Sequence, residues 1–446
     1  LPCNLPQNIV PSLGTIGYGP TMDAEAFEPG VEFARRMDRE DPLAGFRYEF
    51  FHDASEPNLI YLDGNSLGRM PRRAADLVAD LVNDQWGGRL SRGWNEGWFD
   101  LPNRVGDRLA GLVGASAGEV TLADSTSVCL YKAAAAAVAA RPGRTRIITD
   151  DLNFPSDVQV LRAVARAAGP DHEVVVLGSD GVHGPDELLA DAIDDTTALV
   201  SLSHVAYRSG WCWDLDAVTA LAHQAGALVL WDLCHSVGAV PIDLNAVGVD
   251  LAVGCTYKYL NGGPGSPAFL FVSSGLPDLV NPIDGWYGSD EPMAFEFDAE
   301  RAPGVNRFMT GTPPVVSTAL VEPGVDLLLE AGMDRVRDKS VALSERFITL
   351  VDARLVPLGF EVRSPRDHQR RGSHVSLFHP DARAVGQALI HEESVILDFR
   401  PPDLLRFGFA PLYTSFSDVD EAVSRTVRVV EGGGVDRWCD TVPVVP

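Results

Sequence analysis

Asp232-Leu-Cys-His235 follows the apolar run Ala227 to Trp231, and Thr256-Tyr257-Lys258-Tyr259 follows the next one, Leu251 to Cys255. An acid and a lysine thus stand where two successive apolar strands end. In one protein fold this arrangement binds pyridoxal phosphate: the lysine amine forms a Schiff base with the cofactor aldehyde, and the acid pairs with the pyridine nitrogen, so that the ring accepts electrons. The two segments therefore predict a site for that cofactor.

Short apolar runs and helical stretches alternate around this pair. The apolar runs are mostly continuous, which is typical of strands buried on both faces of a mostly parallel sheet, and the alternation indicates βαβ crossovers. The fold class is therefore α/β, and ligands in such sheets bind at the carboxyl ends of the strands, where Asp232 and Lys258 fall. Further strands are expected at Thr145 to Thr149, Glu173 to Leu177, Ala198 to Leu202 and Ala268 to Val272, and helices at Ser156 to Ala168 and Leu215 to Ala225.

The length of 446 residues suits two domains. We expect residues 1–80 to form an N-terminal arm, rich in Pro and Gly up to Gly30, and a segment that packs with the smaller domain. Residues 81–290 are expected to form the large cofactor-binding domain, and residues 291–446 a smaller α+β domain. The smaller domain shows a long helical pattern from Val316 to Leu355, strands near Glu361 to Val362 and His374 to Phe378, and a last helix from Asp418 to Val430.

Composition excludes several classes of protein. Asp and Glu number 62 against 36 Lys and Arg, a formal net charge of −26, which disfavours binding to nucleic acid or to an anionic membrane. The six cysteines form no CxxC and no spacing with histidine that suggests zinc, so no metal is expected and the thiols are expected to be reduced. No apolar run approaches the roughly 18 residues of a membrane-spanning helix. The sequence therefore predicts a cytoplasmic protein.

Each member of the opening pair also has an ordinary structural explanation. A lysine after a strand is usually a surface residue, an acid in such a position often caps the next helix, and His235 could be a satisfied core histidine. Their combination favours the cofactor site, because Tyr257 adds a hydroxyl beside Lys258 and the turn Asn261-Gly-Gly-Pro-Gly265 lets backbone approach a ligand closely.

Two further segments fit a phosphorylated aromatic ligand. Asp124-Ser-Thr-Ser-Val128 precedes an Ala-rich helix, and hydroxyls with free N–H groups at a helix N-terminus bind phosphate, although an ordinary helix cap explains this segment equally well. In Phe154-Pro-Ser-Asp157 the aromatic ring could stack on a flat ligand and Asp157 could reach a ring hydroxyl, or the segment could merely begin a helix.

These segments resemble kynureninase, a pyridoxal-phosphate enzyme with the aspartate-aminotransferase fold. The similarity runs from about Tyr61 to Val430. Tyr61-Leu-Asp-Gly-Asn-Ser-Leu-Gly68 resembles an early family motif, Phe154 to Asp157 the Phe-Pro-Ser-Asp motif, and Thr256 to Gly265 the motif around the cofactor lysine. With Asp232-x-x-His235, four motifs occur in the family order, a combination that is specific although each alone is weak.

The resemblance implies a role for each matching residue. Lys258 would carry the cofactor, Asp232 would pair with its pyridine nitrogen, and Phe154 would stack on its ring. Tyr257 would also relay protons, and Arg406 would clamp the substrate carboxylate, for which a guanidinium fork is suited. The remaining positions implied around the cofactor and its phosphate are Thr126, Ser127, Asp157, Ser203 and His235, and those implied around the substrate are Asn65, Ser66, Trp94 and Gly311.

The resemblance also implies partners and a substrate. Trp286 and Thr312 match positions that reach the site from the other subunit, which predicts a homodimer. Trp94 and the pair Gly311-Thr312 resemble the bacterial form of the family, which favours L-kynurenine over the 3-hydroxy compound. The expected activity is therefore the hydrolytic cleavage of L-kynurenine between the β and γ carbons, giving anthranilate and L-alanine.

Three alternatives stay open. The first is a hydrolase that prefers 3-hydroxykynurenine or another substituted kynurenine. The second is a cysteine desulfurase or selenocysteine lyase, which shares the fold but needs a catalytic cysteine in a loop of the smaller domain, where Cys439 is almost terminal. The third is a binding protein that keeps the fold without turnover.

Overall fold

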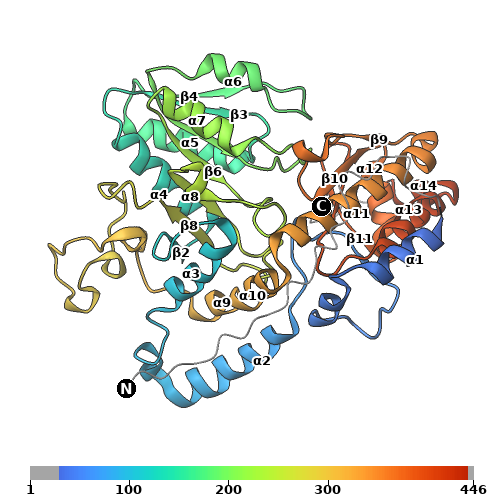
Figure 1. Ribbon diagram of the computed structural model, residues 1–446, viewed down its shortest axis with the longest axis horizontal. Helices are drawn as coiled ribbons and strands as arrows, with labels where there is room; N and C mark the ends of the chain where they lie inside the picture. Colours follow the sequence, from blue (N-terminus) through green and yellow to red (C-terminus); the bar gives the residue numbers. More distant parts are fainter. Residues whose placement is uncertain (1–29, 440–446) are drawn as a thin grey trace, which may run out of the picture.

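Seven strands form the central sheet of the computed structural model, which describes residues 30–439 (Figure 1). Their order is β2-β8-β7-β6-β5-β3-β4, and β8 runs antiparallel to its neighbours while the other pairs are parallel. All the strands expected from the apolar runs of this part are present at nearly the predicted bounds, and β2 was not predicted. The strands are β2 Val120–Ala123, β3 Arg146–Asp150, β4 Glu173–Leu177, β5 Thr197–Ser203, β6 Leu228–Asp232, β7 Leu251–Gly254 and β8 Ala268–Val272.

The central sheet is buried on both faces, as its continuous apolar strands predict. In β6, Val229 and Trp231 enter one core cluster, whereas Leu228 and Leu230 enter another on the opposite face. Successive side chains of a strand point to opposite faces, so a fully apolar run fills both cores. The helices of this part are α3 Leu101–Val113, α4 Thr126–Ala139, α5 Pro155–Ala168, α6 Asp186–Ala192, α7 Leu215–Gln224 and α8 Leu244–Val247.

A smaller sheet, with strand order β12-β13-β10-β9, lies beside the central sheet and its helices (Figure 1). In its core, the ring of Phe347 contacts the rings of Phe407 and Phe409. Its strands are β9 Glu361–Val362, β10 His374–Phe378, β12 Asp398–Arg400 and β13 Leu404–Gly408, and a separate parallel pair is formed by β1 Ile60–Tyr61 and β11 Val395–Ile396. The helices are α1 Val31–Glu40, α11 Met333–Arg354, α12 Ala382–Glu392, α13 Phe416–Glu431 and α14 Gly434–Trp438.

The long helical pattern expected from Val316 to Leu355 is not one helix. The structure divides it into α9 Val315–Ala319, α10 Glu322–Ala331 and α11. Gly332 has a φ of 80°, which a continuous right-handed helix excludes, and Pro323 stands in the first turn of α10, a position suited to starting a helix. The composition favours helix throughout this stretch, but Pro323 and Gly332 mark where one helix ends and the next begins.

The boundary between the two units follows from the packing of these helices. Val325 and Leu328 of α10 join the core cluster of the central sheet, whereas Leu343 and Phe347 of α11 join that of the small sheet. We therefore propose a boundary near Gly332 rather than at residue 291. At the other end of the chain, α1 packs in the small core; the expected arm at residues 1–29 lies outside the described residues.

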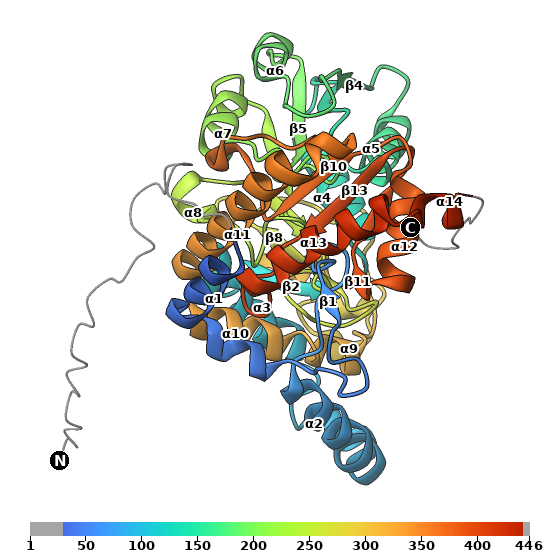
Figure 2. The same cartoon turned by 90° about the vertical axis from the view of Figure 1, so that its right-hand side faces the viewer.

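Helix α2, Arg72–Asp80, continues into a π-helical segment, Leu81–Arg89, and both views show this part extending away from the rest of the molecule (Figures 1 and 2). Trp86 and Leu90 are exposed there. The short 3₁₀ segments are Ala44–Glu49, Leu90–Trp94, Trp286–Gly288, Pro292–Ala294, Gly304–Phe308, Val356–Leu358 and His368–Arg370. Across residues 30–439, no helix has the length and apolar composition needed to cross a membrane.

Candidate active site

The carboxyl ends of β5, β6 and β7 bring the predicted residues together. Ser203 ends β5, Asp232 ends β6 in register with it, and Lys258 lies in the turn that follows β7. Parallel neighbouring strands end at the same edge of a sheet, which is why residues far apart in sequence meet here.

Lys258 is the one lysine that is free to react. The sequence contains only two others, Lys132 and Lys339, and each is buried in an ion pair, with Asp124 at 2.6 Å and Asp41 at 2.7 Å. A lysine buried in such a pair has no access to an aldehyde. The structure therefore leaves one amine for a covalent bond to a cofactor.

His235 lies beside that amine. The Nζ atom of Lys258 is 3.0 Å from Nε2 of His235. Burial and the nearby charge of Lys258 lower the pKa of His235 well below its ordinary value, so the imidazole is neutral and accepts a hydrogen bond from the lysine. This contact orients the amine.

Asp232 is held by its neighbours in a fixed orientation. Its Oδ1 accepts a hydrogen bond of 2.8 Å from the backbone N–H of Cys234, and its Oδ2 lies 3.3 Å from the hydroxyl of Ser203. That hydroxyl is also 2.6 Å from Oδ1 of Asn153, a residue that the sequence did not single out. A carboxylate fixed in this way can pair with a ring nitrogen.

Asp157 lies near Asp232 and is buried in the first turn of α5. Its Oδ2 has no hydrogen-bond partner among the described residues. Burial and the neighbouring carboxylate of Asp232 raise the pKa of Asp157 well above its ordinary value. Asp157 therefore keeps a proton that it can donate to a ligand.

The first turn of α4 is built for an anion. Ser125 is the N-cap residue, but its side chain makes no capping hydrogen bond, so the N–H groups of this turn are left for another acceptor. Thr126 and Ser127 begin the helix, and Oγ1 of Thr126 lies 3.8 Å from Sγ of Cys234, next to Asp232. The helix terminus thus faces the end of β6.

Phe154 lies at the same edge, immediately before α5, and is 39% exposed. Its ring makes an edge contact with Tyr207, with the centroids 5.1 Å apart. One face of the Phe154 ring is therefore available to a flat ligand. Tyr207 lies in the loop after β5 and was not singled out from the sequence.

The segment Asn65 to Gly68 touches the lysine turn. The N–H of Gly68 donates to the carbonyl of Tyr257 at 2.8 Å. A Cβ at Gly68 would meet the Lys258 carbonyl at 2.3 Å, so only glycine allows this approach. The early motif, far from Tyr257 and Lys258 in sequence, therefore helps to fix the backbone of these two residues.

Arg406, in β13, contacts Ser66 of the same segment. It is fully buried, and its guanidinium forms a two-pronged ion pair with Asp398, with Nε at 2.7 Å from Oδ1. It also donates to the hydroxyl of Ser66 at 3.1 Å and to the carbonyl of Tyr207 at 2.5 Å. Sequence reasoning missed Asp398, although a buried guanidinium requires a carboxylate partner and this acid precedes Arg406 closely.

Four predicted residues lie elsewhere in the single chain. Trp286 contacts Tyr287 and Phe295. These residues belong to segment 284–301, which we call the lobe and which lies in the gold part of the chain at the left of Figure 1. Gly311 and Thr312 are exposed in the segment that leaves this lobe, and Trp94 packs edge-on against Trp98 with the centroids 5.7 Å apart. The described contacts of these residues do not include Lys258 or Arg406.

The chemistry of the site fits pyridoxal phosphate. Lys258 would supply an amine for the aldehyde, Asp232 a carboxylate for the ring nitrogen, and the uncapped turn of α4 would supply donors for the phosphate. The unpartnered oxygen of Asp157 fits a ring hydroxyl. No group of three His, Cys, Asp or Glu side chains within residues 30–439 is arranged to hold a metal ion.

Comparison of the sequence with known families and proteins agrees with this assignment. A family model described as the kynureninase C-terminal domain matches residues 336–426. The kynureninase of Pseudomonas fluorescens is 45% identical over 393 residues, which cover 87% of this chain and 92% of the relative. The kynureninase of Burkholderia pseudomallei strain K96243 is 45% identical over 398 residues, covering 88% and 93%.

Solved structures with a similar fold are more distant in sequence. The cysteine desulfurase of Thermococcus onnurineus NA1 superposes with a TM-score of 0.75 at 17% identity, and that of Escherichia coli with 0.74 at 20%; each comparison covers 87% of this chain and 98% of the other. A C-DES variant with glycine covalently linked to its pyridoxal phosphate gives 0.73 at 18% identity, covering 85% and 98%. These likenesses confirm the predicted fold class, that of the fold-type-I pyridoxal-phosphate enzymes.

Proposed function

The chain belongs to the kynureninase family, and from that premise we propose that its preferred substrate is L-kynurenine. The enzyme hydrolyses a carbon–carbon bond of kynurenine with pyridoxal phosphate as cofactor. The preference for the unsubstituted compound is supported by Trp94 and by Gly311-Thr312, which match the bacterial form of the family.

The position of the segment Asn65 to Gly68 supports the binding of an amino-acid substrate between Lys258 and Arg406. Gly68 contacts the turn that holds Lys258, and Ser66 contacts Arg406. An amino-acid substrate has an amine and a carboxylate on one carbon, so its two binding groups must lie close together. A single short segment that touches both proposed partners provides this spacing.

The proposed roles follow from the contacts. Bound here, pyridoxal phosphate supplies an electron sink for the bonding pair released at the substrate α-carbon. Lys258 would hold the cofactor and would also serve as the base for the α-proton, while Arg406 would orient the carboxylate. Asp232 would pair with the pyridine nitrogen. Water attacks the γ-carbonyl, and cleavage between the β and γ carbons releases anthranilate; Tyr257 delivers a proton to the fragment that becomes L-alanine.

The residues around these groups position the cofactor. Thr126 and Ser127 would bind its phosphate at the N-terminus of α4, and Phe154 would stack on its ring. Asp157 would donate its proton to the ring hydroxyl. Further positions proposed on this face of the ring are His235 and Ser203.

A homodimer would complete the site. The lobe that carries Trp286 also exposes apolar side chains: Met293 is 67% exposed, Phe295 63% and Phe297 fully exposed. Clustered apolar surface of this kind is typical of a subunit interface. We propose that this lobe and Thr312 reach the cofactor of a second copy of the chain.

Mixing two inactive variants tests the dimer. Lys258→Ala removes the amine from its own site, and Trp286→Ala would impair the site of its partner. If the lobe acts across an interface, hybrids regain one intact site, and the mixture is more active than the sum of its components. A monomer by light scattering, or no gain on mixing after unfolding and refolding together, rejects this arrangement.

We further propose a cytoplasmic location. Within residues 30–439 the cysteines are free thiols, and Cys129, Cys212, Cys234 and Cys255 are buried. Free thiols of this number are usual in a reducing compartment. Fluorescence of a tagged full-length protein in cells of the source organism tests this location.

One assay separates the candidate activities. The purified enzyme with pyridoxal phosphate is given L-kynurenine, 3-hydroxykynurenine or L-cysteine, and anthranilate, hydroxyanthranilate and sulfide are measured. We expect the largest kcat/KM for L-kynurenine. A larger value for 3-hydroxykynurenine rejects the proposed preference, and sulfide as the sole product identifies a desulfurase.

A further inference from the structure

His374 lies on the face of the small sheet that carries Arg406. It begins β10, and Ser376, two residues later, stands directly opposite Arg406 of β13. Alternate residues of a strand share one face, as do directly opposed residues of neighbouring strands, so His374 and Arg406 project in the same direction. Since Arg406 donates to the carbonyl of Tyr207 in the loop after β5, this face is turned toward the central sheet.

The imidazole of His374 makes no hydrogen bond within the described part of the chain. It is fully buried, and neither ring nitrogen has a hydrogen-bond partner among residues 30–439. Its ring centroid lies 5.9 Å from that of His235, which contacts Lys258. Leaving a buried polar group without a partner destabilises a protein, so such a group beside an active site indicates a missing ligand atom.

Asn65 is a second side chain of this kind next to His374. It is fully buried, and neither its amide nitrogen nor its amide oxygen has a partner in the described part of the chain. It lies over Gly408, the residue directly opposite His374, where an added Cβ would meet Asn65 Oδ1 at 1.9 Å. Gly408 thus makes room for the carboxamide, and two unpartnered polar groups lie together beside Arg406.

Arg406 alone offers little to an incoming carboxylate. A guanidinium has five N–H donors. Two of those of Arg406 are directed to Asp398, one to the hydroxyl of Ser66 and one to the carbonyl of Tyr207. One donor is left, whereas a carboxylate accepts about four hydrogen bonds. Further donors are therefore required at this position.

His374 can act as such a donor without a charge of its own. Burial, followed by the charge of Arg406, lowers the pKa of His374 to about 3, so the ring is neutral at physiological pH. Besides Arg406, the charged groups that act on it are Asp398, Lys258 and Arg400. A neutral imidazole has one N–H to donate and one nitrogen to accept.

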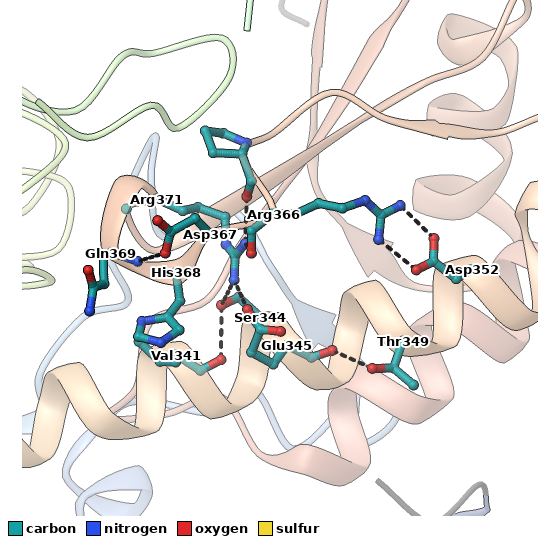
Figure 3. A network of polar contacts seen from close by, with 12 residues as sticks. Val341, Ser344, Glu345, Thr349, Asp352, Arg366, Asp367, His368, Gln369 and Arg371 are labelled. Atoms are coloured by element: carbon teal, nitrogen blue, oxygen red, sulfur yellow. Dashed lines mark hydrogen bonds and ion pairs between the residues drawn. The ribbon is translucent and has the colours of Figure 1, made fainter. Parts of the chain in front are cut away.

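The position of His374 is fixed from behind by the segment that leads into β10. Arg371, also buried, donates to the carbonyl of Pro365 at 2.5 Å and pairs with Glu345 of α11, as Figure 3 shows. This network ties the chain before His374 to a long helix. The backbone that leads into His374 is therefore anchored to α11.

We propose that His374, together with Asn65, binds the α-carboxylate of the amino-acid substrate beside Arg406. The inference rests on the carboxylate role proposed for Arg406. Arg406 and His374 are both fully buried and project from the same face of the small sheet, so one carboxylate bound there can contact both.

Binding of L-alanine to the holoenzyme tests the inference, because this product carries the carboxylate without the aromatic group. The change in cofactor absorption on titration gives Kd, and turnover of L-kynurenine gives KM and kcat. We compare wild type with His374→Leu, His374→Gln and, as a matched control, His379→Gln. His379 follows the other end of β10 and packs on Phe360.

We expect His374→Leu to raise Kd and KM about tenfold, the effect of one lost hydrogen bond to a charged group, with a smaller change in kcat. His374→Gln keeps a donor, so its Kd and KM should stay within about threefold of the wild-type values. The Kd and KM of His379→Gln should equal those of wild type. If His374→Leu does not fold, Asn65→Ala must raise both constants instead.

Equal constants in wild type and a folded His374→Leu overturn the inference, as does a fall in kcat with Kd unchanged. Arg406→Lys separates this result from failure of the proposed function. If Arg406→Lys binds L-alanine as wild type does, the carboxylate site itself is misplaced. If it binds weakly while His374→Leu binds normally, Arg406 keeps its role and the role of His374 alone is wrong.

Discussion

The amine of Lys258 and the imidazole of His235 lie 3.0 Å apart, although they follow two different strands of the central sheet. The imidazole is neutral because burial and the lysine charge disfavour its protonation, so the hydrogen bond runs from lysine to histidine. The contact fixes the direction of the only lysine in the chain that is not buried in an ion pair.

Lys258→Ala should therefore remove both the covalent bond to the cofactor and the base for the α-proton. We expect kcat to fall by about a thousandfold or more, as for other catalytic residues whose roles are linked. Borohydride reduction of the wild type followed by peptide mapping should place the cofactor on Lys258. Label on Lys132 or Lys339 would contradict the assignment.

Asp398→Asn tests the buried ion pair that holds Arg406. Burial alone would raise the pKa of Asp398, but hydrogen bonds from Arg406 hold it below the ordinary value, so the carboxylate stays ionised. Removing one partner leaves the other charge buried and uncompensated, and we expect a loss of about 3–5 kcal/mol in the free energy of unfolding. Urea denaturation measures it.

Asp352→Asn is the matched control for that loss. Asp352 pairs with Arg366 at 2.7 Å on the outer side of α11, where both side chains are largely exposed (Figure 3). Exposed pairs contribute about 0–1 kcal/mol. Similar losses in the two variants would show that burial does not strengthen the Asp398 pair.

The sequence predicted the strand-end residues well, because a buried strand is a continuous apolar run and the first polar residue after it must lie at the edge of the sheet. Asp232 and Lys258 are found in this way. The pairing of Asp398 with Arg406 depends on the register of two antiparallel strands, which local pattern does not determine. The break at Gly332 depends on one backbone angle within an otherwise helical composition.

Lys132→Met tests how the N-terminus of α4 is held. The Nζ atom of Lys132 contacts Asp124 at 2.6 Å and the carbonyl of Phe308 at 2.5 Å, and Asp124 has a φ of 41°, which is unfavourable for a residue with a side chain. Loss of the ion pair should release Asp124 and disorder the proposed phosphate site. We expect about tenfold weaker cofactor binding on reconstitution of the apoenzyme.

The double variant Lys132→Met/Asp124→Asn serves as its control. If the effect comes from the uncompensated Asp124 carboxylate, the double variant should be more stable than Lys132→Met alone. If the stability losses of Lys132→Met and Asp124→Asn add up to the loss of the double variant, Lys132 and Asp124 act independently.

Asp63 gives a prediction about pH. Burial and the carboxylate of Asp398 raise the pKa of Asp63 to about 7. Between about pH 4, where the unfolded chain loses this proton, and about pH 7, the folded protein binds more protons than the unfolded one. Stability therefore falls as pH rises through this window, by up to about 1.4 kcal/mol per pH unit, and is constant above it.

Asp63→Asn removes this titration, so the variant should gain stability relative to wild type as the pH rises from 5 to 8 in urea denaturation. Asp53→Asn is the control. Hydrogen bonds from Ser55 lower the pKa of Asp53, so its ionisation does not change across this range and its difference from wild type should be constant. A constant difference for Asp63→Asn as well would mean that the pKa of Asp63 is not raised in the folded protein.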